Sequence, residues 1–122
     1  MANGFVWFDL NAQGAAIPAV IDFYRAVFDG PITAGDPDSV YRGWLMNGDR
    51  PWAGVVATNG PAGGNWVPYV QVDDLDGAVE AAVAAGGTVV VPRAAGPAGE
   101  AVTMTDPAGA LVALWVPFAS GA

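Results

Sequence analysis

The strongest constraint on the fold of this chain is an internal repeat. A strand-like apolar run, an amphipathic helical pattern and further strand-like runs occur twice, and the copies are offset by about 60 residues. The pairs Leu10/Val72 and Asn47/Asp106 mark this offset. Each copy has the size of one supersecondary unit, so the sequence predicts an α+β chain made of two related units.

The first copy combines one helical pattern with several strand-like runs. Pro18 falls in the first turn of the helical pattern, where its missing N–H is tolerated, and Gly30-Pro31 ends the pattern. Asn47-Gly48 is a strong hairpin signal. The expected elements are a buried strand at 5–10, a helix at 16–28, a short strand near 32–33, and strands at 40–46 and 52–58.

The second copy repeats this order after a Gly-, Pro- and Asn-rich linker at 59–65. Asp73-Asp74 favours a helix N-terminus, and Gly86-Gly87 ends that helix. Asp106-Pro107-Ala108-Gly109 predicts a type I turn in which Asp106 has a structural role. The expected elements are strands at 66–72, 88–91, 101–105 and 110–116 with a helical stripe at 75–83, giving one domain (1–122) with units at 1–58 and 66–118.

Composition removes several classes of function. The 122 residues include no cysteine and no histidine, so disulfides, a thiol nucleophile and a histidine or cysteine metal centre are excluded. Twelve acids against four arginines give a net charge of −8, which disfavours nucleic acid. The apolar runs are too short to span a bilayer, and the start lacks the pattern of a signal peptide, so we expect a cytoplasmic protein without membrane partners.

The order of these motifs resembles a known superfamily. The helix start Asp73-Asp74-Leu75-Asp76, the stop Gly86-Gly87, the turn 106–110 and the segment 22–28 (DFYRAVF) together resemble the vicinal oxygen chelate superfamily, which includes glyoxalases, bleomycin-resistance proteins and extradiol dioxygenases. The resemblance implies two βαβββ units whose curved mixed sheet encloses a cavity, with the helices on the outside.

The resemblance also implies where metal ligands would lie. In metal-dependent members they occupy the first and last strands of each unit, which here correspond to positions near Trp7, Val67 and Ala113, and to Val55 or Ala57. None of these side chains binds a metal ion. The spacing of Asp9, Glu100 and Asp106 gives no sign of a site made of carboxylates alone. The sequence therefore predicts a metal-independent branch with no cofactor.

Strand alternation indicates which side chains face the expected cavity. Phe5, Trp7 and Asp9 share one face of the first strand, and the same reasoning groups Val67, Tyr69 and Gln71, and also Leu111, Ala113 and Trp115. Five tryptophans are candidates for stacking against a planar ligand: a core or dimer-interface role fits each one better when it is taken singly, but we expect at least one or two of the five to line the cavity. The five are Trp7, Trp44, Trp52, Trp66 and Trp115.

Polar candidates are fewer. Asp9 beside aromatic rings would suit an acid or base, but the interpretation we favour is that it caps the turn at 11–14. Tyr69 and Gln71 could orient a ligand or be ordinary strand residues at a rim. Arg42 could pair with an acidic group of a ligand, and solvent exposure without a ligand role is equally compatible with it. Glu100 and Met104 are expected near the mouth of the cavity.

Three functions remain open. The first is a metal-independent, dimeric binding protein that holds or sequesters an aromatic or polycyclic natural product, as antibiotic-resistance relatives do. The second is a cofactor-free cyclase, isomerase or epimerase that uses Asp9 or Tyr69 to handle a proton. The third is a regulatory or structural domain without a ligand. The absence of a recognisable catalytic set favours the first.

Overall fold

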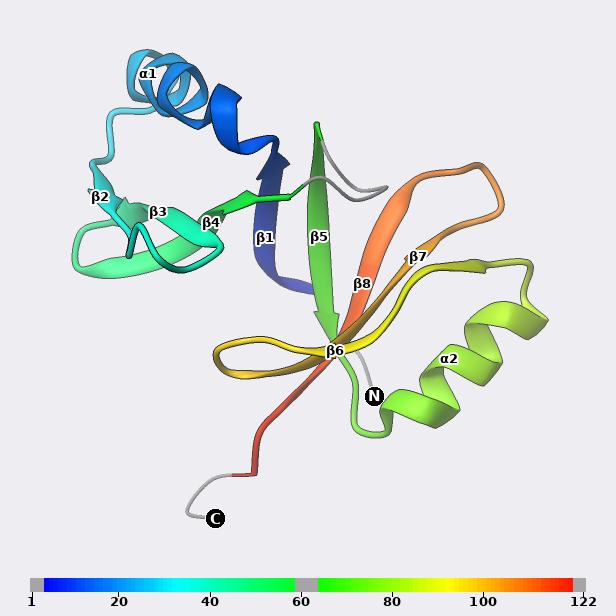
Figure 1. The fold of residues 1–122 in the computed structure, drawn as a ribbon. Coiled ribbons are helices and arrows are strands. Elements are labelled where there is room, and N and C mark those ends of the chain that lie inside the picture. Colours follow the sequence, from blue (N-terminus) through cyan, green and yellow to red (C-terminus); the bar gives the residue numbers. More distant parts are fainter. Residues whose placement is uncertain (1–3, 59–63, 120–122) are drawn as a thin grey trace. The chain divides into compact units, whose positions relative to one another are not determined.

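The structure, a computed structural model, describes residues 4–58 and 64–119 and forms two compact units (Figure 1). Residues 7–67 make up the N-terminal unit, and residues 68–119 with 4–6 make up the C-terminal unit. Most of the predicted linker, at 59–63, lies outside the described residues. Each unit combines a mixed four-stranded sheet with one α-helix, so the predicted α+β class is confirmed.

The N-terminal unit has the strand order β2-β3-β4-β1. Strand β1 runs parallel to β4, and the other neighbours are antiparallel. The bounds of its elements are β1 (Phe5–Ala12), a 3₁₀ turn (Gly14–Ala16), α1 (Ile17–Val27), β2 (Ile32–Ala34), β3 (Tyr41–Asn47) and β4 (Arg50–Ala57).

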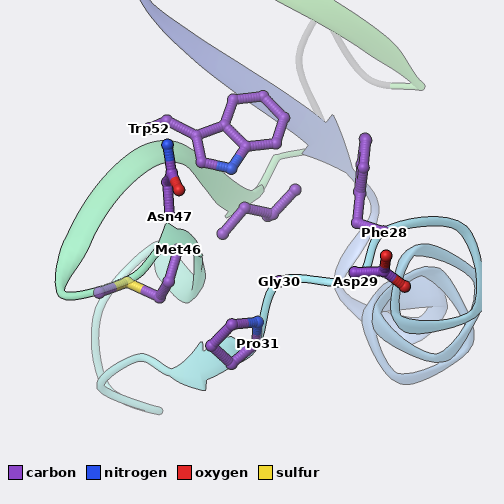
Figure 2. A pocket seen from close by; sticks show the side chains of 8 residues that line it. Phe28, Asp29, Gly30, Pro31, Met46, Asn47 and Trp52 are labelled. Carbon is purple, nitrogen blue, oxygen red and sulfur yellow. The ribbon is translucent and has the colours of Figure 1, made fainter.

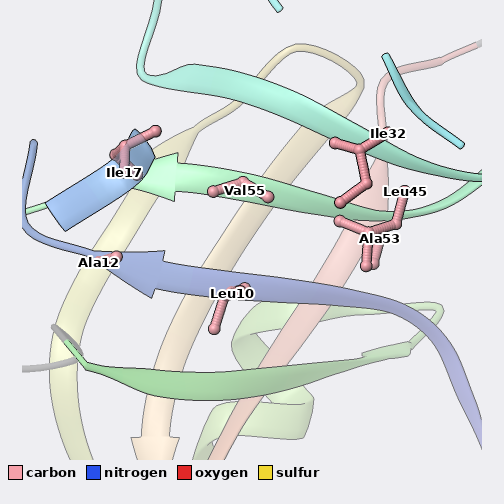
Figure 3. Packing of buried hydrophobic residues seen from close by; sticks show 7 residues of the cluster. All are labelled: Leu10, Ala12, Ile17, Ile32, Leu45, Ala53 and Val55. Atoms are coloured by element: carbon pink, nitrogen blue, oxygen red, sulfur yellow. The ribbon is translucent and has the colours of Figure 1, made fainter. Parts of the chain in front are cut away.

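Helix α1 covers one face of this sheet. Leu10 of β1, Leu45 of β3 and Val55 of β4 lie in the same buried cluster as Ile17 of α1 (Figure 3). Pro18 lies in the first turn of α1, as the sequence predicts. The buried apolar side chains on neighbouring strands supply most of the driving force for packing α1 on the sheet.

The C-terminal unit repeats this arrangement with the order β5-β8-β7-β6, and β5 runs parallel to β8. Leu75 of α2 is buried with Val102, Met104 and Leu114 of β7 and β8. The Asp74 carboxylate caps α2 by accepting a hydrogen bond from the Gly77 N–H at 3.2 Å. The bounds are β5 (Asn65–Gln71), α2 (Leu75–Ala84), β6 (Thr88–Ala95), β7 (Gly99–Thr105) and β8 (Leu111–Pro117).

One strand is clearly longer than the sequence predicts. Strand β6 continues past Val91 to Ala95, through Pro92. A proline interrupts a central strand, but β6 is the edge strand of this sheet, and the register with β7 is irregular between Val91 and Ala94. The missing N–H of Pro92 therefore costs no ladder hydrogen bond that the sheet requires.

The turn at residues 106–109 forms as predicted. The Asp106 carboxylate accepts hydrogen bonds from the N–H groups of Ala108 and Ala110 at 2.9 and 3.0 Å, and Gly109 has a φ of 91°. Asp106 thus satisfies two backbone donors between β7 and β8, which confirms its structural role. In the described parts of the chain, no helix has the length and apolar character needed to cross a membrane.

Candidate functional site

A buried carboxylate lies on the sheet face of the N-terminal unit that is opposite α1. The Asp9 side chain is only 4 % exposed. Its Oδ1 accepts a hydrogen bond from the Trp7 indole N–H at 2.7 Å, and its Oδ2 accepts one from the Tyr41 hydroxyl at 3.1 Å. Because a buried carboxylate is costly unless hydrogen-bonded, these two donors are central to the stability of this face.

The rings around Asp9 form one connected group. Tyr41 and Trp44 stack with their centroids 4.8 Å apart and their planes inclined by 9°. Trp7 meets Trp44 edge-on at 6.0 Å. All three side chains are partly exposed. We call Trp7, Asp9, Tyr41 and Trp44 the Asp9 face.

A β-bulge brings Tyr41 and Trp44 to the same face although they are three residues apart. Tyr41 pairs with Val56 and Gly43 with Val55, so Arg42 is an extra residue in β3. Arg42 uses its Nε–H to donate to the Ser39 carbonyl at 2.7 Å. The structure thus places Arg42 at the bulge, where it fixes the local chain.

Gly54 makes room for the Tyr41 ring. It is the cross-strand partner of Asp9, and a Cβ atom at Gly54 would lie 2.7 and 2.8 Å from the Cε1 and Cδ1 atoms of Tyr41. The ring therefore lies directly over a position without a side chain, from which its hydroxyl reaches the carboxylate. Neither Tyr41 nor Gly54 is among the predicted site residues, because the cross-strand register and the bulge leave no local pattern in the sequence.

Burial raises the pKa of the Tyr41 hydroxyl above its ordinary value of 10.0, and the negative charge of Asp9 and the hydrogen bond to it act in the same direction. Tyr41 is therefore a hydrogen-bond donor throughout the physiological pH range. Trp7 and Tyr41 donate to the Asp9 carboxylate, and neither belongs to the turn at 11–14; that Asp9 also caps this turn stays a prediction.

Two other predicted tryptophans lie on the opposite, α1-covered face. The pairing of β3 with β4 shifts a second time, between Leu45 and Met46, and Trp52 is the extra residue in β4 at this shift. Both Trp52 and Trp66 pack against the buried cluster under α1. Their rings stack at 6.2 Å, and the Trp66 indole N–H donates to the Tyr24 hydroxyl at 2.9 Å. The structure therefore separates Trp52 and Trp66 from Trp7 and Trp44.

The remaining candidates belong to the C-terminal unit. Val70, Val72, Val112 and Val116 pack toward α2, so alternation turns the other side of β5 and β8 away from the helix. On this other side, Gln71 of β5 is the cross-strand partner of Trp115 of β8, and Tyr69 is the partner of Ala113.

Glu100 and Met104 need a correction, because both lie on the α2 side of β7. Met104 is 1 % exposed in the core beside Leu75, and Glu100 forms an ion pair with Arg93 at 3.0 Å. A one-residue error in strand register exchanges the two faces, which explains the wrong placement at a cavity mouth.

One expected metal-ligand position also needs correction. Val55 and Ala57 belong to the packing under α1, and the β4 residues on the same side as Trp7 are Gly54 and Val56. Trp7, Val67 and Ala113 carry no metal-binding atom, and neither do Gly54 and Val56. Residues 4–58 and 64–119 contain no group of three or more His, Cys, Asp or Glu side chains suited to a metal ion. The side chains at these positions therefore do not fit a metal centre.

Comparison with known proteins identifies the family. The profile of the glyoxalase-like domain matches residues 8–115. Two curated relatives, the putative glyoxylase CFP32 of Mycobacterium bovis and that of Mycobacterium tuberculosis, are each 34% identical over 118 residues. The match includes 89% of this chain and 44% of each relative, so the chain spans less than half the length of these relatives.

Solved structures agree on the fold. The Mn(II)-bound glyoxalase from Novosphingobium aromaticivorans has a TM-score of 0.63 at 16% identity, over 100% of this chain and 42% of that chain. A glyoxalase/bleomycin resistance protein/dioxygenase superfamily member from Vibrio splendidus has a TM-score of 0.57 at 13% identity, over 95% of this chain and 99% of that one. The resemblance to the vicinal oxygen chelate fold is thus confirmed, and the chain belongs to the glyoxalase-like domain family.

Proposed function

We propose that this protein binds a small aromatic or polycyclic molecule on the Asp9 face, without a metal ion, and releases it unchanged. The observation that carries the proposal is the buried Asp9 carboxylate, which accepts hydrogen bonds from Trp7 and Tyr41. These bonds hold two partly exposed rings in one orientation. Rings fixed before binding lose little entropy when a planar ligand stacks on them.

The burial of Asp9 favours binding over catalysis. With 4 % of its surface exposed and its oxygens engaged by protein donors, Asp9 is poorly placed to exchange a proton with a substrate. Its charge instead stabilises the hydrogen bonds that orient the rings. In this proposal Asp9 is a positioning residue, and the contact with the ligand is made by the aromatic surfaces.

The apolar side chains at Trp7, Val67 and Ala113 support metal independence, since ion-assisted chemistry needs several nitrogen, sulfur or oxygen ligands. One structural neighbour is described as Mn(II)-bound and another as a bleomycin-resistance superfamily member. Because the side chains at these positions carry no metal-binding atom, we favour a binding role related to that of a bleomycin-resistance protein over Mn(II)-dependent chemistry. We include in the proposal a cytoplasmic homodimer that sequesters a natural product.

The five tryptophan indole N–H signals provide a direct test by ¹H–¹⁵N NMR, with bi- and tricyclic probes such as 2-naphthol and acridone. The Trp7 and Trp44 signals should shift on titration, and Trp44→Ala should weaken binding at least about tenfold. Phe23→Ala, which removes a ring that is 59 % exposed on α1, should leave the affinity unchanged.

Two results would overturn the proposal. The first is the absence of shifts at Trp7 and Trp44 with every probe. The second is chemical conversion of a bound compound that is lost in Asp9→Asn, which would favour the cofactor-free enzyme instead. Treatment with EDTA should leave the affinities unchanged, and a loss of binding that Mn(II) restores would contradict the metal-independent part.

A further inference from the structure

A separate pocket lies on the α1 side of the N-terminal unit, between the end of α1 and the β3–β4 hairpin (Figure 2). Its volume is about 420 Å³, which is within the range of small-molecule sites. Three short segments line it: the end of α1 with the residues after it, the end of β3, and the bulge in β4. Their lining residues are Phe28, Asp29, Gly30, Pro31, Leu45, Met46, Asn47 and Trp52.

The walls of this pocket are held in place by ring contacts, both within the lining and to residues outside it. Trp52 meets Phe28 edge-on at 5.4 Å, and it stacks on Trp66 at 6.2 Å with the planes 8° apart. Phe8 adds an edge contact to Trp52 at 6.2 Å. The Trp52 ring is therefore braced on several sides, so a ligand does not have to order it.

Backbone contacts fix the wall that the segment after α1 forms with the end of β3. The Met46 N–H donates to the Pro31 carbonyl at 3.0 Å. A Cβ atom at Gly30 would lie 2.5 Å from the Met46 carbonyl oxygen, so only glycine allows the chain after α1 to pass this close to β3. The distance between these two wall segments is thus set by main-chain contacts.

The chemistry of the lining is apolar with a polar rim. Phe28, Leu45 and Trp52 provide the rings and aliphatic surface, and the exposed residues Asp29 and Asn47 provide the polar groups. Asp29 is the one ionisable side chain of this lining, and the whole chain carries a net charge of −8. This electrostatic environment attracts a cation and repels an anion.

We infer that this pocket is a second binding site, for a small aromatic amine whose ring packs against the Phe28–Trp52 pair and whose ammonium group lies at the rim near Asp29. The site is independent of the proposed function, because Trp52 and Leu45 lie on the α1 side of the sheet, while Trp7 and Trp44 lie on the other side.

The test uses three probes that share a phenylethyl body and differ in the end group: phenethylamine, 2-phenylethanol and 3-phenylpropionate. In ¹H–¹⁵N NMR titrations, the Trp52 indole and Asn47 amide signals should shift, while those of Trp7 and Trp44 should remain in place. The affinity should fall from the amine to the alcohol to the carboxylate in steps of about two- to fivefold, as expected for a charge at an exposed site.

Asp29→Asn is the decisive variant. It should lower the affinity for phenethylamine to that for 2-phenylethanol and leave the affinity for the alcohol unchanged. Asp22→Asn, which removes an exposed acid of α1 that does not line the pocket, is the matched control and should change neither affinity.

Each contrary outcome has a clear meaning. Equal affinities for the amine and the carboxylate, or an unchanged amine affinity in Asp29→Asn, would refute the ligand class. Shifts at Trp7 and Trp44 in place of Trp52, or no shift with 10 mM phenethylamine (a concentration of about ten times the 1 mM scale of weak binding), would refute the site. Failure of this second site leaves the proposal for the Asp9 face standing, because that proposal is tested by the Trp7 and Trp44 signals with the bi- and tricyclic probes.

Discussion

Replacing Gly54 by alanine tests whether the Tyr41 ring depends on the missing side chain beneath it. The new Cβ atom would lie 2.7 Å from the Tyr41 Cε1 atom, whereas ordinary contacts begin near 3.4 Å. The ring therefore has to rise by about 0.7 Å. Such a movement lengthens the hydroxyl contacts to Asp9, now 3.1 and 3.3 Å, beyond hydrogen-bond distance.

The expected cost follows from that lost bond. A hydrogen bond to a charged group contributes about 1.5–3 kcal/mol, and alanine returns about 0.4–1 kcal/mol by restricting the unfolded chain. We expect Gly54→Ala to lower the free energy of unfolding by about 1–2 kcal/mol. This corresponds to a fall in Tm of about 4–8 °C for a domain of this size, measurable by calorimetry or circular dichroism.

The same substitution in a Tyr41→Ala background provides the refuting experiment. Without the ring, the Cβ atom of residue 54 loses its two closest contacts, and the next is to Asp9 Oδ1 at an ordinary 3.4 Å, so Gly54→Ala should become neutral or slightly stabilising. Gly14→Ala is the matched control, because nothing lies within 4 Å of its Cβ position. An equal loss of stability with and without the Tyr41 ring would show that the ring does not depend on Gly54.

Three further predictions concern single groups. Because the pKa of Tyr41 is raised on folding, its folded form retains the proton more tightly; stability should be constant below pH 10 and fall as the pH rises above it. Absorbance at about 295 nm should show that Tyr41 ionises above its ordinary range, and Tyr41→Phe should remove this absorbance step together with its share of the loss of stability at alkaline pH. Asp106→Ala should cost about 1–2 kcal/mol, by chemical denaturation, because two backbone N–H groups lose their acceptor, whereas Asp106→Asn should retain most of the stability. Arg93→Gln should change Tm only slightly, because the ion pairs of Arg93 with Asp76 and Glu100 are solvent-exposed. The difference in Tm should vanish in about 1 M salt, where the Debye length is about 3 Å. A difference that persists in this salt would contradict the prediction.

The sequence predicted most of the elements, because each unit follows strong local rules. Pro18 and Asp74 mark helix starts in the structure as they do in the sequence, and the turn at Asp106 depends on three neighbouring residues. Alternation also assigned the faces of β1 and β8 correctly, since no extra residue interrupts the pairings given for them.

The candidate site was predicted only in part. The sequence points to Trp7, Asp9 and Trp44 but not to Tyr41 and Gly54, because these two residues come next to Asp9 only through pairing between strands. Strands β3 and β4 each contain an extra residue, and one such residue shifts every later side chain to the other face. Such bulges depend on the partner strand, so alternation within a single strand does not reveal them.

The parallel pairing of first and last strands, present in both units, has a kinetic consequence. Phe8 pairs with Ala53, and Tyr69 pairs with Ala113, so each pairing joins residues about 45 positions apart. The hairpins β3–β4 and β7–β8 join near neighbours and form contacts early, on the microsecond scale of isolated hairpins. Closing β1 onto β4 and β5 onto β8 is therefore the slow step within each unit, and until it occurs the edges of β4 and β8 expose backbone groups to other chains.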